Sequence, residues 1–140
     1  MAIKEASGDL EQCQAIVEQK PEDFLVISGD DALTLPLISL GFDGVISVIA
    51  NAYPSEMFEL VNAALTKDLA TAQNLHFQMT EMFQLLFEEG NPAGVKCVMN
   101  EMRLCENELR LPMIPVTENL KVKLSNAMRL MALHSHIHST

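Results

Sequence analysis

The chain has 140 residues, of which 49% are hydrophobic, so it is long enough to build one apolar core and is not a disordered tail. Its formal charge of −10 repels phosphate backbones and anionic membranes, and no apolar stretch reaches the length of a membrane span without a charge, Gly or Pro. Three cysteines without CxxC spacing indicate neither a disulfide framework nor a zinc ribbon, and they fit a reducing cytosol. Together, these features predict a soluble cytoplasmic protein that binds neither nucleic acid nor membrane.

The first third of the chain alternates short apolar runs with helical patterns, which is typical of βα units around a parallel sheet. A turn follows the first apolar stub, and Asp9 is in position to cap a helix that runs to about Gln19. Residues 24–27 and 44–51 show little polar alternation, so each predicts a buried strand. A short helix between these strands is expected to end at Gly41.

From Pro54 onward the apolar period is helical throughout. The pattern predicts helices at about residues 54–66, 68–89, 92–103 and 117–133. The change of period near residue 67 divides the chain into a predicted α/β part, residues 1–67, and an all-α part, residues 68–140. The all-α part is expected to keep its structure best, since its contacts are local.

Loops at the carboxyl ends of parallel strands gather around one site. In this sequence they include Lys4 and residues 28–31 and 46–51. A lysine at a strand end in a low dielectric has a lowered pKa, so that its neutral amine can attack a ketone or aldehyde and form a Schiff base. A lysine so near the start of a chain is more often solvated and inert. The residues alone leave both interpretations of Lys4 open.

Other acidic residues have simpler interpretations than general acid–base chemistry. Asp31 is expected to cap a helix, and Glu5 is expected to interact with nearby backbone groups or with a nearby charge. Glu88 and Glu89 are expected to face solvent at a helix end, where the helix dipole disfavours them.

Three histidines near the end of the sequence alternate with other residues. His134, His136 and His138 could line one face of a strand and coordinate Zn²⁺ or Ni²⁺. A frayed terminus is the simpler interpretation, because chain ends are often poorly ordered. No metal site is therefore predicted.

Four segments carry a more specific signal, namely IKEASGDLEQ, FLVISGDDALTLPLISLGFDGVISVIAN, LLFEEGNPAGVK and ENELRLPMIPVTENL. In this order and with this spacing, from residue 2 or 3 to about residue 130, they resemble the carboxyl-terminal half of the dihydrodipicolinate synthase family. Within the wider group of pyruvate-dependent aldolases, KEASGD, SGDD and NPAGVK favour this family over the sialic-acid lyases.

The resemblance implies a partial (β/α)8 barrel, made of the end of strand six, strands seven and eight and their helices, followed by an all-α carboxyl-terminal region. It implies that Lys4 forms the Schiff base with pyruvate, that the backbone at Ile46 lies against pyruvate, and that Gly29 leaves room for the substrate. The family's enamine then attacks aspartate semialdehyde on the way to diaminopimelate and lysine. No cofactor is implied beyond the covalent Schiff base.

The resemblance also implies that much of the enzyme lies elsewhere. The family's first five strands would precede Met1, together with the threonine and tyrosines of its proton relay, the arginine for the second substrate and the lysine-feedback site. An unpaired strand edge tends to aggregate or to pair with another chain, so the isolated chain is expected to be only marginally stable and to be inactive. Lys4 is also expected to lose its buried setting.

The family commonly assembles as a dimer of dimers, which implies a homo-oligomer. Two alternatives stay open at this stage. One is another aldolase of the same fold group that uses pyruvate with a different aldehyde. The other is an inactive fragment that serves only as a helical oligomerisation module.

Overall fold

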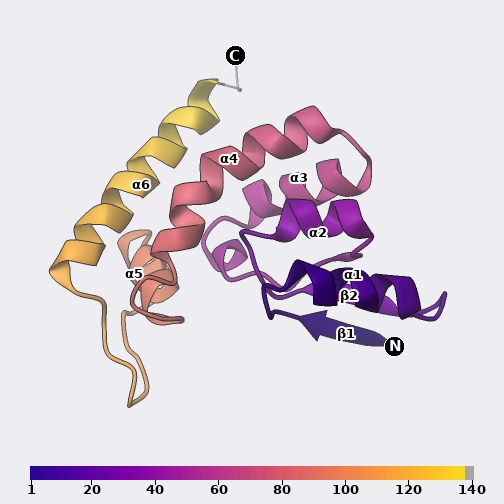
Figure 1. Ribbon diagram of the computed structural model, residues 1–140. Helices are drawn as coiled ribbons and strands as arrows, with labels where there is room; N and C mark the ends of the chain where they lie inside the picture. Colours follow the sequence, from indigo (N-terminus) through magenta and orange to yellow (C-terminus); the bar gives the residue numbers. More distant parts are fainter. Residues whose placement is uncertain (138–140) are drawn as a thin grey trace.

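The computed structural model describes residues 1–137, the side chains of 134–137 excepted. Three parallel strands form one sheet in the order β1-β2-β3. Helices follow each strand, and the rest of the chain continues as helices alone (Figure 1). The elements in chain order are β1 Ala2–Glu5, α1 Leu10–Gln19, β2 Leu25–Ser28, α2 Thr34–Leu40, β3 Gly44–Val45, a 3-10 turn η1 Ile49–Asn51, α3 Pro54–Leu65, α4 Leu69–Leu85, α5 Ala93–Glu101 and α6 Glu118–Ile137. The predicted α/β fold with a parallel sheet is confirmed.

The first helix forms where the sequence predicts it. Asp9 caps α1, because its carboxylate accepts the backbone N–H groups of Glu11 at 2.9 Å and Gln12 at 3.2 Å. Cys13 on α1 packs with Val26 of β2 and with apolar residues of α2. This small apolar cluster fixes the helices on one face of the sheet.

The third strand is shorter than residues 44–51, so that prediction is wrong beyond Val45. The cause is the carboxylate of Asp31, which is 2% exposed and accepts the N–H groups of Val48 at 3.0 Å and Ile49 at 2.8 Å. These bonds turn the chain into η1 instead of extending the strand. The expectation that Asp31 caps the following helix is also wrong, because the N-cap of α2 is Leu33 and no side chain forms a capping hydrogen bond there.

The main apolar core joins η1 to the four helices α3 to α6. Its fully buried members include Ile49, Leu60, Met79, Met82, Val98, Leu120 and Leu124. These residues come from both sides of residue 67, and the division of the chain at that point stays a prediction. Burying each such side chain stabilises the fold by about 1.5–3 kcal/mol relative to leaving it in water.

The helix boundaries depart from the expected ones near the chain's end. Helix α4 ends at Leu85 instead of 89, and α6 continues to Ile137 instead of ending at 133. His134 and His136 therefore lie in a helix and not in the strand in which they could have lined one face. His138 lies outside the described residues.

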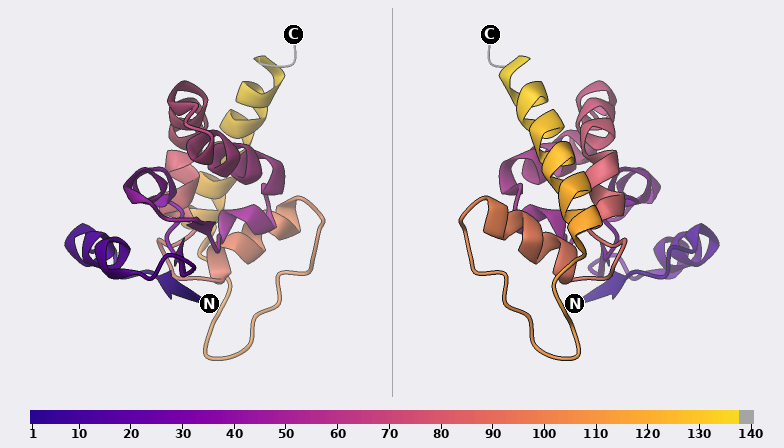
Figure 2. Two further views of the ribbon diagram at one scale, coloured as in Figure 1. Left: turned by 90° about the vertical axis from the view of Figure 1, so that its right-hand side faces the viewer. Right: turned by 90° about the vertical axis from the view of Figure 1, so that its left-hand side faces the viewer.

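Between α5 and α6, residues 102–117 form a long loop that extends away from the helices (Figure 2). Apolar side chains on this loop reach solvent, since Leu111 is 86% exposed and Ile114 is 69% exposed. Within the described part of the chain, none of the helices combines the length and apolar character that crossing a membrane requires.

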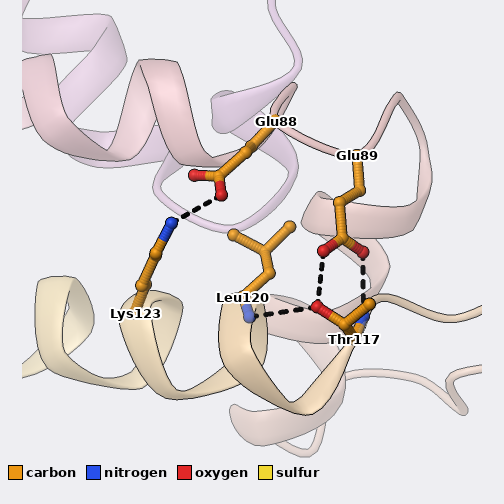
Figure 3. A network of polar contacts seen from close by, with 5 residues as sticks. All are labelled: Glu88, Glu89, Thr117, Leu120 and Lys123. Carbon is orange, nitrogen blue, oxygen red and sulfur yellow. Dashed lines mark hydrogen bonds and ion pairs between the residues drawn. The ribbon is translucent and has the colours of Figure 1, made fainter.

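Glu88 and Glu89 bind the start of α6, as Figure 3 shows. Glu89 accepts hydrogen bonds from the backbone N–H of Thr117, at 2.8 Å, and from its hydroxyl. Glu88 forms an ion pair with Lys123 at 2.6 Å. The two residues are exposed as expected, but the expectation that a helix dipole disfavours Glu89 is wrong. Glu89 instead lies at the amino end of α6, where the helix dipole favours a carboxylate.

Replacing Glu89 with glutamine is expected to lower the urea midpoint of unfolding at neutral pH, because the cap on α6 loses its charge. The Thr117 hydrogen bonds hold the pKa of Glu89 below its ordinary 4.5. This stabilisation is therefore present above pH 4.5 and is lost as the pH falls through the lower folded-state pKa. The difference between Glu89→Gln and the wild type should shrink over that interval. Glu108→Gln, an exposed loop variant, is the control, and an equal loss there would contradict the cap.

Candidate functional site

The carboxyl ends of the three strands lie side by side. Glu5 is opposite Ser28 in the parallel register, and the N–H of Gly29 donates to the Glu5 carbonyl at 2.7 Å. The N–H of Ile46 donates to the Ser28 carbonyl at 2.8 Å. The fold thus brings Lys4, Gly29 and Ile46, the three candidate site residues, to one edge of the sheet.

Lys4 and Gly29 are in direct contact. A Cβ atom placed on Gly29 would lie 2.6 Å from the Cε of Lys4 and 2.6 Å from the Cβ of Ala6. Carbon atoms do not approach so closely, so the lysine side chain can cross this point only because residue 29 is a glycine. The space expected to be left for a substrate is occupied here by Lys4 itself.

One face of the sheet is accessible. Lys4 is exposed and Leu25 is 48% exposed, whereas Val26 on the other face is buried against the helices. Residues 24–27 are therefore not a fully buried strand, because the described helices cover only one side of it. Ile46 is 57% exposed at the same sheet edge. The exposure of Lys4 agrees with the expectation that it lacks a buried setting.

Behind Lys4, the carboxylate of Glu5 is buried among donors. It accepts hydrogen bonds from the N–H of Ser7 at 2.8 Å, the side-chain amide of Gln12 at 3.0 Å and the thiol of Cys13 at 3.0 Å. Burial raises the pKa of Glu5, but these hydrogen bonds outweigh it and hold that pKa below the ordinary value. The expectation that Glu5 holds nearby backbone is confirmed by the bond from Ser7.

The thiol of Cys13 is a hydrogen-bond donor and not a nucleophile. Burial, together with the hydrogen bond to Glu5, raises the pKa of Cys13 to about 11, so the thiol stays protonated at neutral pH. The contact between Cys13 and Glu5 was not predicted from the sequence. The available signal was an acidic residue one position after an exposed lysine in a strand, which alternation places on the helix-covered face.

The chain's one tyrosine is in the main core. Tyr53 is 8% exposed, and burial, with a smaller contribution from Glu56, raises its pKa to about 12. Its hydroxyl is therefore not suited to exchanging protons with a substrate at neutral pH.

Comparisons with known sequences and structures all point to one protein family. The sequence profile of the dihydrodipicolinate synthetase family matches residues 1–131. The 4-hydroxy-tetrahydrodipicolinate synthase of Phocaeicola vulgatus is 55% identical over 115 residues, which are 82% of this chain and 39% of that protein. The chain therefore spans well under half the length of this relative.

Two solved structures show that the fold is shared over the same part. Chloride-inhibited dihydrodipicolinate synthase from Acinetobacter baumannii, complexed with pyruvate, matches with a TM-score of 0.88 and 36% identity, over 93% of this chain and 45% of that chain. A dihydrodipicolinate synthase described as the first monomeric variant matches with a TM-score of 0.90 and 37% identity, over 94% and 45%.

Proposed function

Because this chain belongs to the dihydrodipicolinate synthetase family, we propose that it carries the Schiff-base part of a pyruvate-dependent lyase of lysine and diaminopimelate biosynthesis in the cytoplasm. In this proposal β1, β2 and β3 are the last three strands of a (β/α)8 barrel, and the later helices form the family's carboxyl-terminal region. The observation that carries the proposal is the convergence of Lys4, Gly29 and Ile46 at neighbouring strand ends.

The chemistry begins at the Nζ of Lys4. The neutral amine attacks the ketone carbon of pyruvate, and the resulting carbinolamine loses water to leave a carbon–nitrogen double bond. This imine withdraws electrons from the methyl group of the bound pyruvate. The methyl group loses a proton, and the imine is thereby converted into an enamine. The enamine carbon attacks the aldehyde of aspartate semialdehyde, and water then hydrolyses the imine and frees Lys4. The imine is the electron sink, so no separate cofactor is needed.

Gly29 and Ile46 have supporting roles in this proposal. Gly29 lets the Lys4 side chain pass, and the backbone at Ile46 lies against the bound pyruvate. Turnover requires groups that transfer protons and a cover for the open face of the sheet. We propose that both come from the part of the enzyme that the relatives contain beyond their match to this chain.

The test is covalent capture of pyruvate. Borohydride reduces the imine to a stable amine, so incubation with pyruvate and borohydride should add to the chain the mass of one pyruvate, less the water lost on imine formation and plus the two hydrogens of the reduction. Lys4→Arg is expected to abolish this addition, because a guanidinium does not form the imine. Lys67→Arg, which alters an exposed lysine away from the strand ends, should label like the wild type. Equal labelling of both variants would refute the assignment.

We further propose that the chain associates with itself. Apolar side chains of α6 reach solvent, with Val122 59%, Leu130 49% and Leu133 61% exposed. Burying such side chains between two copies is favourable. One similar structure is described as a monomeric variant, so assembly is not a feature of every relative. Light scattering of the purified chain measures its molar mass, and the mass of a single chain would contradict this proposal.

A further inference from the structure

The last residue of β1 buries a carboxylate, which is unusual for an acidic side chain. Glu5 is 6% exposed, whereas Lys4 immediately before it is exposed on the opposite face. Burying an ionised carboxylate is costly unless hydrogen-bond donors surround it, and an apolar side chain can occupy such a position without that cost. Packing alone therefore does not explain a glutamate here.

The three donors to Glu5 come from the turn after β1 and from the start of α1. Ser7 lies in the turn, and Gln12 and Cys13 lie on the first turns of α1. Cys13 is fully buried and is itself held in the apolar cluster behind the sheet. The carboxylate thus fastens the end of the strand to a packed helix.

The same residue also holds the neighbouring strand end. The carbonyl oxygen of Glu5 accepts the N–H of Gly29 at 2.7 Å, and the Cε of Lys4 lies against Gly29. Among the described residues β1 pairs only with β2, so its other edge has no strand to hold it. A rotation of Glu5 would therefore displace Lys4 and Gly29 relative to each other.

We propose that Glu5 is a positioning residue for Lys4, whose buried carboxylate clamps the β1–α1 connection so that the lysine side chain lies across Gly29. The proposal rests on the proposed function of Lys4 as the imine-forming amine. Reaction of that amine depends steeply on its direction, because a misplacement of about 1 Å can slow a reaction about a hundredfold.

Glu5→Gln is the first test. Glutamine keeps the size of the side chain, but its NH₂ group cannot accept the bonds that Cys13 or Gln12 donate. Pyruvate labelling at Lys4, counted per folded molecule, is expected to slow about tenfold or more. Glu11→Gln removes an exposed acid from α1, the helix that binds Glu5, and should label at the wild-type rate. Equal rates in the two variants would overturn the proposal.

Two substitutions of Cys13 separate positioning from packing. Serine retains a hydrogen-bond donor, whereas alanine removes it, and both disturb the apolar cluster. Positioning predicts that Cys13→Ser labels at Lys4 close to the wild-type rate and that Cys13→Ala labels more slowly. If Glu5 served the fold alone, the two variants would label equally per folded molecule.

A measurement without pyruvate keeps this proposal separate from the function of Lys4. Reductive methylation with ¹³C-formaldehyde gives each lysine an NMR signal that reports its surroundings. The Lys4 signal is expected to move in Glu5→Gln and to stay in place in Glu11→Gln. An unmoved signal in Glu5→Gln overturns the positioning role whatever pyruvate does. A moved signal with no pyruvate labelling of the wild type would support positioning and contradict the proposed function.

Discussion

Replacing Gly29 with alanine is expected to abolish pyruvate labelling at Lys4 while the helical core stays folded. The new Cβ would lie 2.6 Å from both the Cε of Lys4 and the Cβ of Ala6, so both residues have to shift. The lysine side chain can move away, but Ala6 is attached directly to the backbone. Such overpacking costs about 1–3 kcal/mol, and it acts where the amine must be aimed. Labelling is measured by mass spectrometry and folding by circular dichroism.

A second substitution provides the control for Gly29→Ala. Ala6→Gly removes one of the two atoms that the new Cβ would strike. The double variant is therefore expected to recover part of the labelling, and Ala6→Gly alone should label like the wild type. Wild-type labelling in Gly29→Ala itself would show that the lysine does not depend on the space at residue 29.

Replacing Gly94 with alanine is expected to cause the largest loss of stability. A Cβ at this position would lie 2.5 Å from the carbonyl oxygen and 2.8 Å from the Cα of Leu86. These are backbone atoms, which cannot rotate away, so α5 must separate from the end of α4. The expected loss is about 3 kcal/mol or more, a large part of the stability of a small domain. The urea midpoint of unfolding measures it.

Gly90→Ala is the matched control for Gly94→Ala. Gly90 has a φ of 95°, and the nearest atom to an added Cβ is the Cε of Met113 at 3.7 Å. Alanine at this position would strain the backbone but would not collide with another atom. It should lower the free energy of unfolding by only about 1–2 kcal/mol. If the two variants lost equal stability, the close packing of α5 on Leu86 would be wrong.

Local signals account for the elements that the sequence predicted well. The Asp9 cap and the Gly41 C-cap depend on residues within one or two turns, and both were predicted. The third strand was predicted wrongly because a residue 17 positions away decides where it ends, through the bond from Val48 to Asp31. The contact of Glu89 with Thr117 was not predicted for the same reason, since the two residues are 28 positions apart.

The candidate site divides in a similar way. The spacing of the residues did not decide whether Lys4 is a reactive amine or an inert surface lysine. The resemblance to a family supplied the expected roles of Lys4, Gly29 and Ile46. The contact of Lys4 with Gly29 depends on the register of β1 and β2, which no local pattern gives. The burial of Glu5 depends on how α1 packs against the sheet, which is also a tertiary property.

The most direct measurement locates the label after incubation with pyruvate and borohydride, by mass spectrometry of peptides from the wild-type chain. The internal controls are the other lysines of the chain, Lys20, Lys67, Lys96, Lys121 and Lys123. If the strand ends form an imine site, the label appears at Lys4 well above these controls. Labelling at Lys4 no higher than at the others would contradict the site, because Lys4 would then react only as a surface amine.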